Sequence, residues 1–238
     1  MMIDMMSGTD KNMLADKESL AEELAAQIAA ALDRELQANG KALLAVSGGS
    51  TPKLFFQKLS EKAIDWAGVT VTLVDERWVD ETSERSNAAL VKANLLTGKA
   101  AAANFFPLYT GDETPMAGLK TLEDQFSSLG IPITAAILGM GGDGHTASFF
   151  PEGDKLSAAL DLDNENTFIE MHAHGAGEPR ITFTLPALLK AAFLALHIEG
   201  EEKQQVLATA LSDGPIEDMP IRAALRQSEK ELTIFWCP

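Results

Sequence analysis

Three short apolar segments of this chain each end in a glycine-rich or strongly polar turn, and this repeated pattern constrains the fold most. The segments span residues 42–46, 69–74 and 134–138, and stretches with helical spacing separate them. Short, continuously apolar runs are typical of strands buried in a parallel sheet. Strands that alternate with helices predict an α/β fold, mainly a parallel sheet with helices on both faces.

Further elements follow from spacing and from capping residues. Apolar residues at helical spacing predict a helix over 17–38 that stops at Asn39-Gly40. Thr51 is expected to cap a helix with Pro52 at its first position, and Ser86 to cap another. With 238 residues, the chain is expected to form a single domain spanning 1–238. The remaining strands are expected near 167–172, 180–185, 193–198 and 232–236, and the remaining helices near 87–96, 115–129 and 201–212.

The charge balance limits the possible partners. The formal net charge is −16, which repels polyphosphate backbones and argues against nucleic acid or an anionic membrane as a partner. The single cysteine, Cys237, excludes an internal disulfide and suits a reducing cytoplasm. Residues 1–6 carry an acid in place of a basic region, so they predict neither a signal peptide nor a membrane span. We expect a cytoplasmic monomer.

Polar clusters follow the predicted strands at their carboxyl ends, where ligands bind in open α/β sheets. One comprises Ser47, Gly48, Gly49 and Ser50, whose hydroxyls and backbone N–H groups suit a phosphate monoester; an ordinary capped turn explains this spacing equally well. The others are Asp75-Glu76-Arg77 and Asp143-Gly144-His145. Convergence of the clusters on one crevice is the simplest interpretation.

His145 is the best candidate for a general base, because imidazole titrates near neutral pH and Asp143 is close enough in sequence to orient it. Residues 139–144 also satisfy the Gly-x-Gly-x-x-Gly pattern of dinucleotide sites. Asp143 would bring negative charge to the pyrophosphate position, and no basic residue nearby offsets it. A nicotinamide or flavin cofactor is therefore disfavoured.

Two cations outside these clusters also suggest an anion site. Arg180 opens a predicted strand, and Lys203 lies in the first helical turn after Gly200, where a cation gains nothing from the helix dipole; a solvated surface lysine is the alternative to anion binding for Lys203. Three other histidines carry weaker signals. His172 and His174 share one face of a presumed strand, but they lack partners for a metal site, and His197 is expected to lie in the core.

Six segments together resemble the 6-phosphogluconolactonase family, which belongs to the superfamily shared with glucosamine-6-phosphate deaminase. The resemblance spans nearly the whole chain and implies the modified Rossmann-like fold of that superfamily. The segments are Ser47–Pro52, Asp75–Val79, Ser86-Asn87, Gly139–Pro151, Arg180–Thr182 and Gly200–Lys203.

The resemblance implies hydrolysis of the δ-lactone of 6-phosphogluconate, in the oxidative pentose phosphate pathway, with no metal and no organic cofactor. By position, His145 resembles the base that activates water, and Arg77 resembles a cation near the sugar acid. The Ser47–Ser50 turn, Arg180 and Lys203 resemble a phosphate clamp. Asp75, Asn87 and Asp143 are expected beside them in the site.

Two rival functions remain. The deaminase motif resembles Gly-His-Ile-Ala-Phe-Asn-Glu-Pro, with a glutamate five residues beyond the histidine, where this chain has Phe150. A benzyl side chain transfers no proton, so the deaminase mechanism loses one member. The other rival is a sugar-phosphate sensor that binds without turnover, which has no need of a base such as His145.

Overall fold

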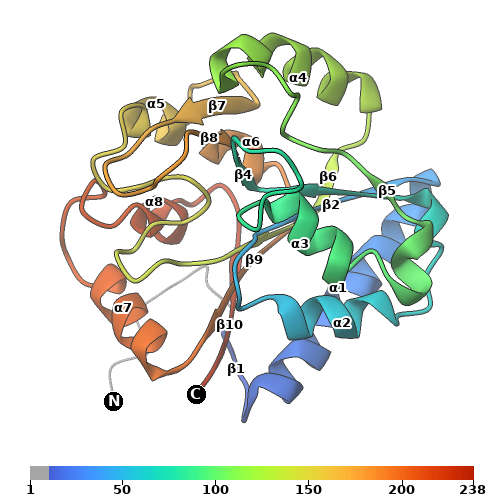
Figure 1. Ribbon diagram of the computed structural model, residues 1–238. Helices are drawn as coiled ribbons and strands as arrows, with labels where there is room; N and C mark the ends of the chain where they lie inside the picture. The colour runs from blue at the N-terminus through green and yellow to red at the C-terminus, as the bar shows by residue number, and fades with distance from the viewer. Residues whose placement is uncertain (1–10) are drawn as a thin grey trace.

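A seven-stranded parallel sheet forms the centre of the computed structural model, which describes residues 11–238 (Figure 1). Its strand order is β1-β10-β9-β6-β2-β3-β5. The chain runs outward from β2 to β5 and then returns to β6 on the other side of β2, so the topological switch point lies between β2 and β6. The strands are β1 (Lys11–Met13), β2 (Ala42–Val46), β3 (Val69–Leu73), β5 (Asn104–Phe105), β6 (Ile133–Leu138), β9 (Phe193–Glu199) and β10 (Leu232–Cys237).

The helices cover both faces of this sheet. Helix α1 crosses β2, β6, β9 and β10 on one face together with α2, whereas α4 lies on the other side, where it packs against β7 (Phe168–Met171), a strand of a second, smaller sheet (Figure 1). With both faces covered, every residue of β2, β3 and β6 is buried, and this burial explains their continuous apolar sequences. The helices are α1 (Lys17–Asn39), α2 (Lys53–Ser60), α3 (Asn87–Asn94), α4 (Pro115–Leu129), α5 (Leu156–Leu160), α6 (Leu185–Leu189), α7 (Glu201–Leu211) and α8 (Ile221–Arg226), with 3₁₀ turns at Trp66–Gly68 and Gly98–Ala102.

A second, antiparallel sheet of three strands joins the end of β3 and was not anticipated from the sequence. Its order is β4 (Asp75–Arg77), β8 (Arg180–Phe183) and β7 (Phe168–Met171). Strands β7 and β8 are joined by a loop without a helix, and a parallel pair would need a longer crossover. Phe183 N donates to Val74 O at 3.0 Å, which fixes β8 against the end of β3.

The α/β fold and its mainly parallel sheet are confirmed, and so are two caps. Ser86 accepts a hydrogen bond from Ala89 N, and Gly40 ends α1 with a positive φ of 72°. The Thr51 cap is wrong: α2 begins one residue later, with Pro52 as N-cap and no capping side chain. Phe56 N already donates to Pro52 O at 2.8 Å, so the threonine hydroxyl stays outside the helix.

The strand predicted at 167–172 ends at Met171, so the shared strand face of His172 and His174 is also wrong. His172 N instead donates to Asp154 Oδ1 at 2.8 Å, which fixes that residue in the loop. His197 is buried on β9, as expected, and its ring meets Phe55 edge-on. The interpretation of residues 1–6 lies outside the described residues. From residue 11 onward, no helix is long and apolar enough to cross a membrane.

Candidate active site

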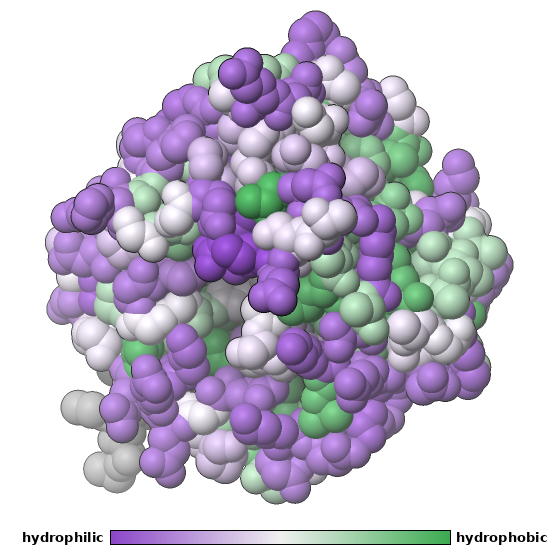
Figure 2. All heavy atoms as spheres, viewed as in Figure 1, coloured by the Kyte–Doolittle hydropathy of each residue, from purple (hydrophilic) through white to green (hydrophobic). Residues whose placement is uncertain are grey.

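The loops that follow β2, β3, β6 and β9 enclose a cavity of about 770 Å³. Figure 2 shows a hollow on the face seen in Figure 1, surrounded mainly by hydrophilic residues. The expected convergence of the polar clusters is confirmed, because every site residue predicted from the sequence lines this cavity. These residues are Ser47, Gly48, Gly49, Ser50, Asp75, Arg77, Asn87, Asp143, His145, Arg180 and Lys203.

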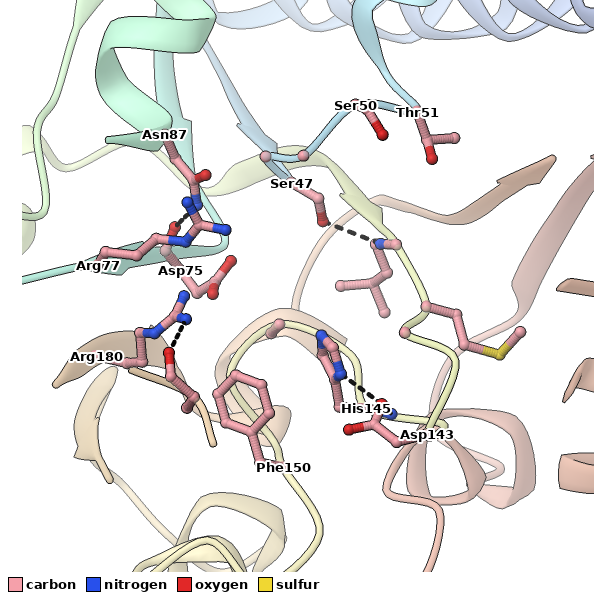
Figure 3. Close-up of a pocket in the computed structure, with 18 of the residues that line it drawn as sticks. Ser47, Ser50, Thr51, Asp75, Arg77, Asn87, Asp143, His145, Phe150 and Arg180 are labelled. Carbon is pink, nitrogen blue, oxygen red and sulfur yellow. Dashed lines mark hydrogen bonds and ion pairs between the residues drawn. The ribbon is translucent and has the colours of Figure 1, made fainter. Parts of the chain in front are cut away.

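Strand order determines how these groups are spread along the sheet edge. The neighbouring strands β9, β6, β2 and β3 lead respectively to Lys203, to His145, to the turn at Ser47 and to Arg77. The lysine and the arginine therefore lie toward opposite ends, with the imidazole between them. Figure 3 shows Arg180 beside Arg77 and Asp75, apart from Ser50 and Thr51.

Ser47 joins the two strands at the switch point. Its Oγ donates to Ile137 O at 2.9 Å and accepts from Gly139 N at 3.0 Å, so it ties the end of β2 to the end of β6. The next residue, Gly48, has to be small, because a Cβ there would lie 1.9 Å from Asn87 Oδ1. The turn is therefore fitted closely to the start of α3.

The Asp143 carboxylate holds the His145 side chain. Asp143 Oδ1 lies 2.6 Å from His145 Nδ1 and accepts from His145 N at 3.1 Å (Figure 3). The hydrogen bond from the His145 side chain lowers the pKa of Asp143 to about 2. An ionised carboxylate only accepts hydrogen bonds, so Nδ1 carries the proton and the lone pair is left on Nε2.

Glycine at position 141 allows this arrangement. A Cβ on Gly141 would lie 2.1 Å from His145 Nδ1, and Gly141 N donates to His145 O at 2.8 Å. Phe150 closes the other side of the imidazole, with 4.7 Å between ring centroids. The Arg180 guanidinium carbon lies 5.4 Å from the same phenyl centroid, so the ring stands between His145 and Arg180.

Two strand arginines face the cavity without carboxylate partners. Arg77 and Arg180 are directly opposite one another in the β4–β8 register, and within residues 11–238 neither forms a salt bridge. Their guanidinium groups donate instead to backbone carbonyls, at Arg85, Glu178 and Ala176. Burial lowers the pKa of Arg180 from its usual value. The charges of Asp75 and Glu178 act against that shift, but neither carboxylate pairs directly with Arg180, and two guanidinium groups without a direct ion pair suit a bound anion.

Asp75 is fixed by a buried neighbour. Its Oδ2 accepts from Ser148 Oγ at 2.6 Å, and its backbone carbonyl accepts from Asn87 Nδ2 at 3.0 Å. Ser148 is fully buried, so this hydroxyl has one clear structural task. The first bond fixes the carboxylate and the second fixes the backbone of Asp75, which lines the cavity.

Glu76 has a different task from its neighbours. It is 1 % exposed and accepts from Arg77 N, Asn87 N and Ala88 N at 2.7–2.9 Å, which anchors the start of α3. Burial raises the pKa of Glu76, although these N–H groups act against that shift. The sequence placed it in a polar cluster without separating this anchoring task from ligand binding.

The cavity is also lined by polar residues that the sequence did not indicate as site members, among them Arg85, Thr51 and His174. Thr51 was assigned to a cap, and His174 to a strand. Arg85 gave no signal, because an arginine in a charged loop is normally solvated. For metals, no group of three or more candidate ligands (His, Cys, Asp or Glu) occurs within residues 11–238.

Comparison with known proteins shows which family this chain belongs to. The family model for glucosamine-6-phosphate isomerases/6-phosphogluconolactonase matches residues 15–236. This chain belongs to that family. A curated 6-phosphogluconolactonase from Rhizobium meliloti is 50 % identical over 227 residues, which cover 95 % of this chain and 98 % of the relative.

Solved structures of the family share the fold. A crystal structure of a 6-phosphogluconolactonase from Shewanella baltica has a TM-score of 0.93 and 38 % identity, and the match covers 97 % of this chain and 98 % of that one. A monomeric glucosamine-6-phosphate deaminase has a TM-score of 0.76 at 17 % identity, with 96 % of this chain and 97 % of that chain covered. At that identity, the second likeness shows the fold alone.

Proposed function

We propose that this chain hydrolyses 6-phospho-D-glucono-1,5-lactone to 6-phosphogluconate, the second step of the oxidative pentose phosphate pathway. The observation that carries the proposal is the Asp143–His145 pair in a cavity lined by Arg77, Arg180 and Lys203. A base and cations in one cavity suit the hydrolysis of an anionic ester. The 50 % identical relative that bears the name 6-phosphogluconolactonase supports the same reaction.

In the proposed mechanism, His145 Nε2 removes a proton from water while the water oxygen attacks C1 of the lactone. The C1–O5 bond then breaks, and the imidazolium returns the proton to the leaving ring oxygen. Asp143 keeps Nδ1 protonated and stabilises the imidazolium while it exists. The resulting carboxylic acid loses its own proton to solvent.

The two cationic ends of the cavity would take different parts of the substrate. We assign the phosphate to Lys203 and to the hydroxyls and backbone N–H groups of the Ser47–Ser50 turn. Arg180 was grouped with that turn from the sequence; because it lies opposite Arg77, we now assign both arginines to the lactone end. There they would face the oxyanion and then the product carboxylate.

The remaining roles follow from the same assignment. Asp75 and Asn87 would bind sugar hydroxyls near the lactone, and Gly48 and Gly49 would let the backbone approach the substrate. We propose that residues 1–238 act as one domain and as a monomer. The proposed reaction requires neither a metal nor an organic cofactor.

Phe150 counts against the deaminase, because its ring lies tilted beside His145 where that reaction needs a carboxyl group. The sensor remains a rival in which the same cavity binds without turnover. We would mix purified protein with freshly generated lactone, measure acid release above the spontaneous rate, and assay ammonia release from glucosamine 6-phosphate in parallel. We expect acceleration of lactone opening alone. Ammonia release would favour the deaminase, and activity on neither would favour the sensor.

A further inference from the structure

An ion pair outside the predicted site joins two loops at the rim of the cavity. The Arg85 side chain, in the loop before α3, contacts the carboxylate of Glu178, in the loop before β8. Arg85 is 52 % exposed and Glu178 is 26 % exposed. By these values alone the pair would be a surface salt bridge of small energetic value.

The backbone carbonyls of the same two residues hold the two strand arginines. Arg77 Nη1 donates to Arg85 O, and Arg180 Nε donates to Glu178 O at 3.3 Å. The bond to Arg85 O is the only one that the Arg77 guanidinium makes within residues 11–238, and its Nε is buried without a partner. The ion pair therefore connects the residues that carry two of the three carbonyl acceptors of Arg77 and Arg180; the third is Ala176 O.

The charges of these two arginines repel, and the nearby Asp75 carboxylate attracts Arg180 against that repulsion. They are directly opposite one another across β4 and β8, where like charges are unfavourable. No salt bridge to either guanidinium occurs within residues 11–238. The carbonyl acceptors and the loops that carry them therefore act together with the Asp75 charge in holding the two cations side by side.

The loop that carries Glu178 is shaped for this contact. Gly175 and Gly177 both have positive φ, at 88° and 77°, and the turn between them directs Ala176 O to Arg180 Nη2 at 2.6 Å. A Cβ on Gly177 would lie 3.3 Å from Arg85 Nη2, so the arginine passes close to this backbone. The second Glu178 oxygen is covered and has no partner within residues 11–238.

We infer that Arg85 and Glu178 are a positioning pair that fixes the loop carbonyls and, through them, the side chains of Arg77 and Arg180. The assignment of the arginines to the lactone end rests on the proposed function, but their positioning does not. The alternative is that Arg85 itself binds the anionic ligand and Glu178 restrains it. The two interpretations predict opposite changes in ligand affinity for Glu178→Ala: weaker binding if the pair positions the strand arginines, and tighter binding if Glu178 restrains Arg85.

The first test needs no ligand. Arg77 and Arg180 are modified with phenylglyoxal, and their rates are read from peptide masses in wild type, Arg85→Ala and Glu178→Ala. Glu81→Gln is the matched control, because it weakens the comparably exposed Lys92–Glu81 pair near the same loop. The inference predicts modification about 3-fold or more faster in both alanine variants. Rates equal to those of the control would overturn it.

The second test uses function. In both alanine variants we expect kcat/KM for the lactone to fall about 3- to 10-fold, with the double variant no worse than the worse single variant. Arg85→Lys should recover most of the loss, since it retains the charge. Affinity for 6-phosphogluconate, measured by calorimetry, should fall in parallel; tighter binding in Glu178→Ala would overturn the inference. A wild type without turnover would overturn the proposed function, and the modification rates would still decide this inference.

Discussion

Asp143 Oδ1 and His145 Nδ1 lie 2.6 Å apart within one glycine-rich turn. The same carboxylate oxygen also accepts the backbone N–H of His145, so the ring and its own backbone share one acceptor. This double contact fixes the imidazole before any ligand arrives. The turn thereby presents a histidine of defined tautomer to the cavity.

The lowered pKa of Asp143 predicts a pH dependence of stability. Its pKa is about 2 in the folded protein, below the usual value near 3.9 in an unfolded chain. The stabilisation is therefore fully present above about pH 4 and is lost as the pH falls toward about 2. We expect the difference in free energy of unfolding between wild type and Asp143→Asn to shrink over that interval. A difference constant from pH 6 to pH 2 would contradict this account.

Gly141 and Gly139 offer a matched pair of substitutions in the same turn. Gly141→Ala places a Cβ 2.1 Å from His145 Nδ1, whereas a Cβ on Gly139 would meet Ser47 Cβ at 3.8 Å, an ordinary contact. We expect Gly141→Ala to displace the ring and reduce kcat by about 10²-fold or more. Gly139→Ala should retain most activity. Similar kinetics for the two variants would show that the ring position does not matter.

The two cationic ends of the cavity predict different substrate effects. Lys203→Ala should raise KM for the phosphorylated lactone and leave hydrolysis of unphosphorylated glucono-1,5-lactone nearly unchanged. Arg180→Ala should reduce kcat/KM for both lactones, by about 10-fold or more, because it acts at the end they share. If Arg180→Ala impaired only the phosphorylated lactone, Arg180 would belong to the phosphate end after all.

Substitution of Glu76 should lower the free energy of unfolding, because this side chain anchors the start of α3. Glu76→Gln replaces one buried acceptor oxygen by an N–H group that faces backbone N–H donors, so we expect a loss of about 2 kcal/mol. Urea unfolding measures the change. Glu81→Gln, at a far more exposed position, should change the free energy of unfolding by less than about 0.5 kcal/mol. Equal effects of the two substitutions would refute the anchoring task.

The convergence of the site could be predicted from the sequence because it depends on one rule. Carboxyl ends of neighbouring parallel strands meet at the same edge, so Ser47, Arg77 and His145 come together once the strands are recognised. Local rules also predicted the Ser86 cap and the glycine stop after α1. In each case the signal lay within a few residues of the feature it specified.

The antiparallel sheet could not be predicted in the same way. The register that places Arg77 opposite Arg180 joins segments far apart in the chain, and no local pattern encodes such a pairing. The contact of Arg85 with Glu178 depends on that register. The sequence around Arg85 therefore did not predict a role for this residue. The Thr51 cap failed by one residue, because the first helical hydrogen bond runs from Phe56 N to Pro52 O, and a sequence pattern does not fix a helix boundary to one residue.

The most direct measurement compares lactone hydrolysis by wild type and by His145→Ala under identical conditions, with 6-phosphogluconate binding measured for both. The account predicts that kcat falls about 10²- to 10⁴-fold while binding changes little, because the variant loses the base and keeps the cationic ends. Equal kcat in the two proteins would contradict the central claim that His145 activates the water.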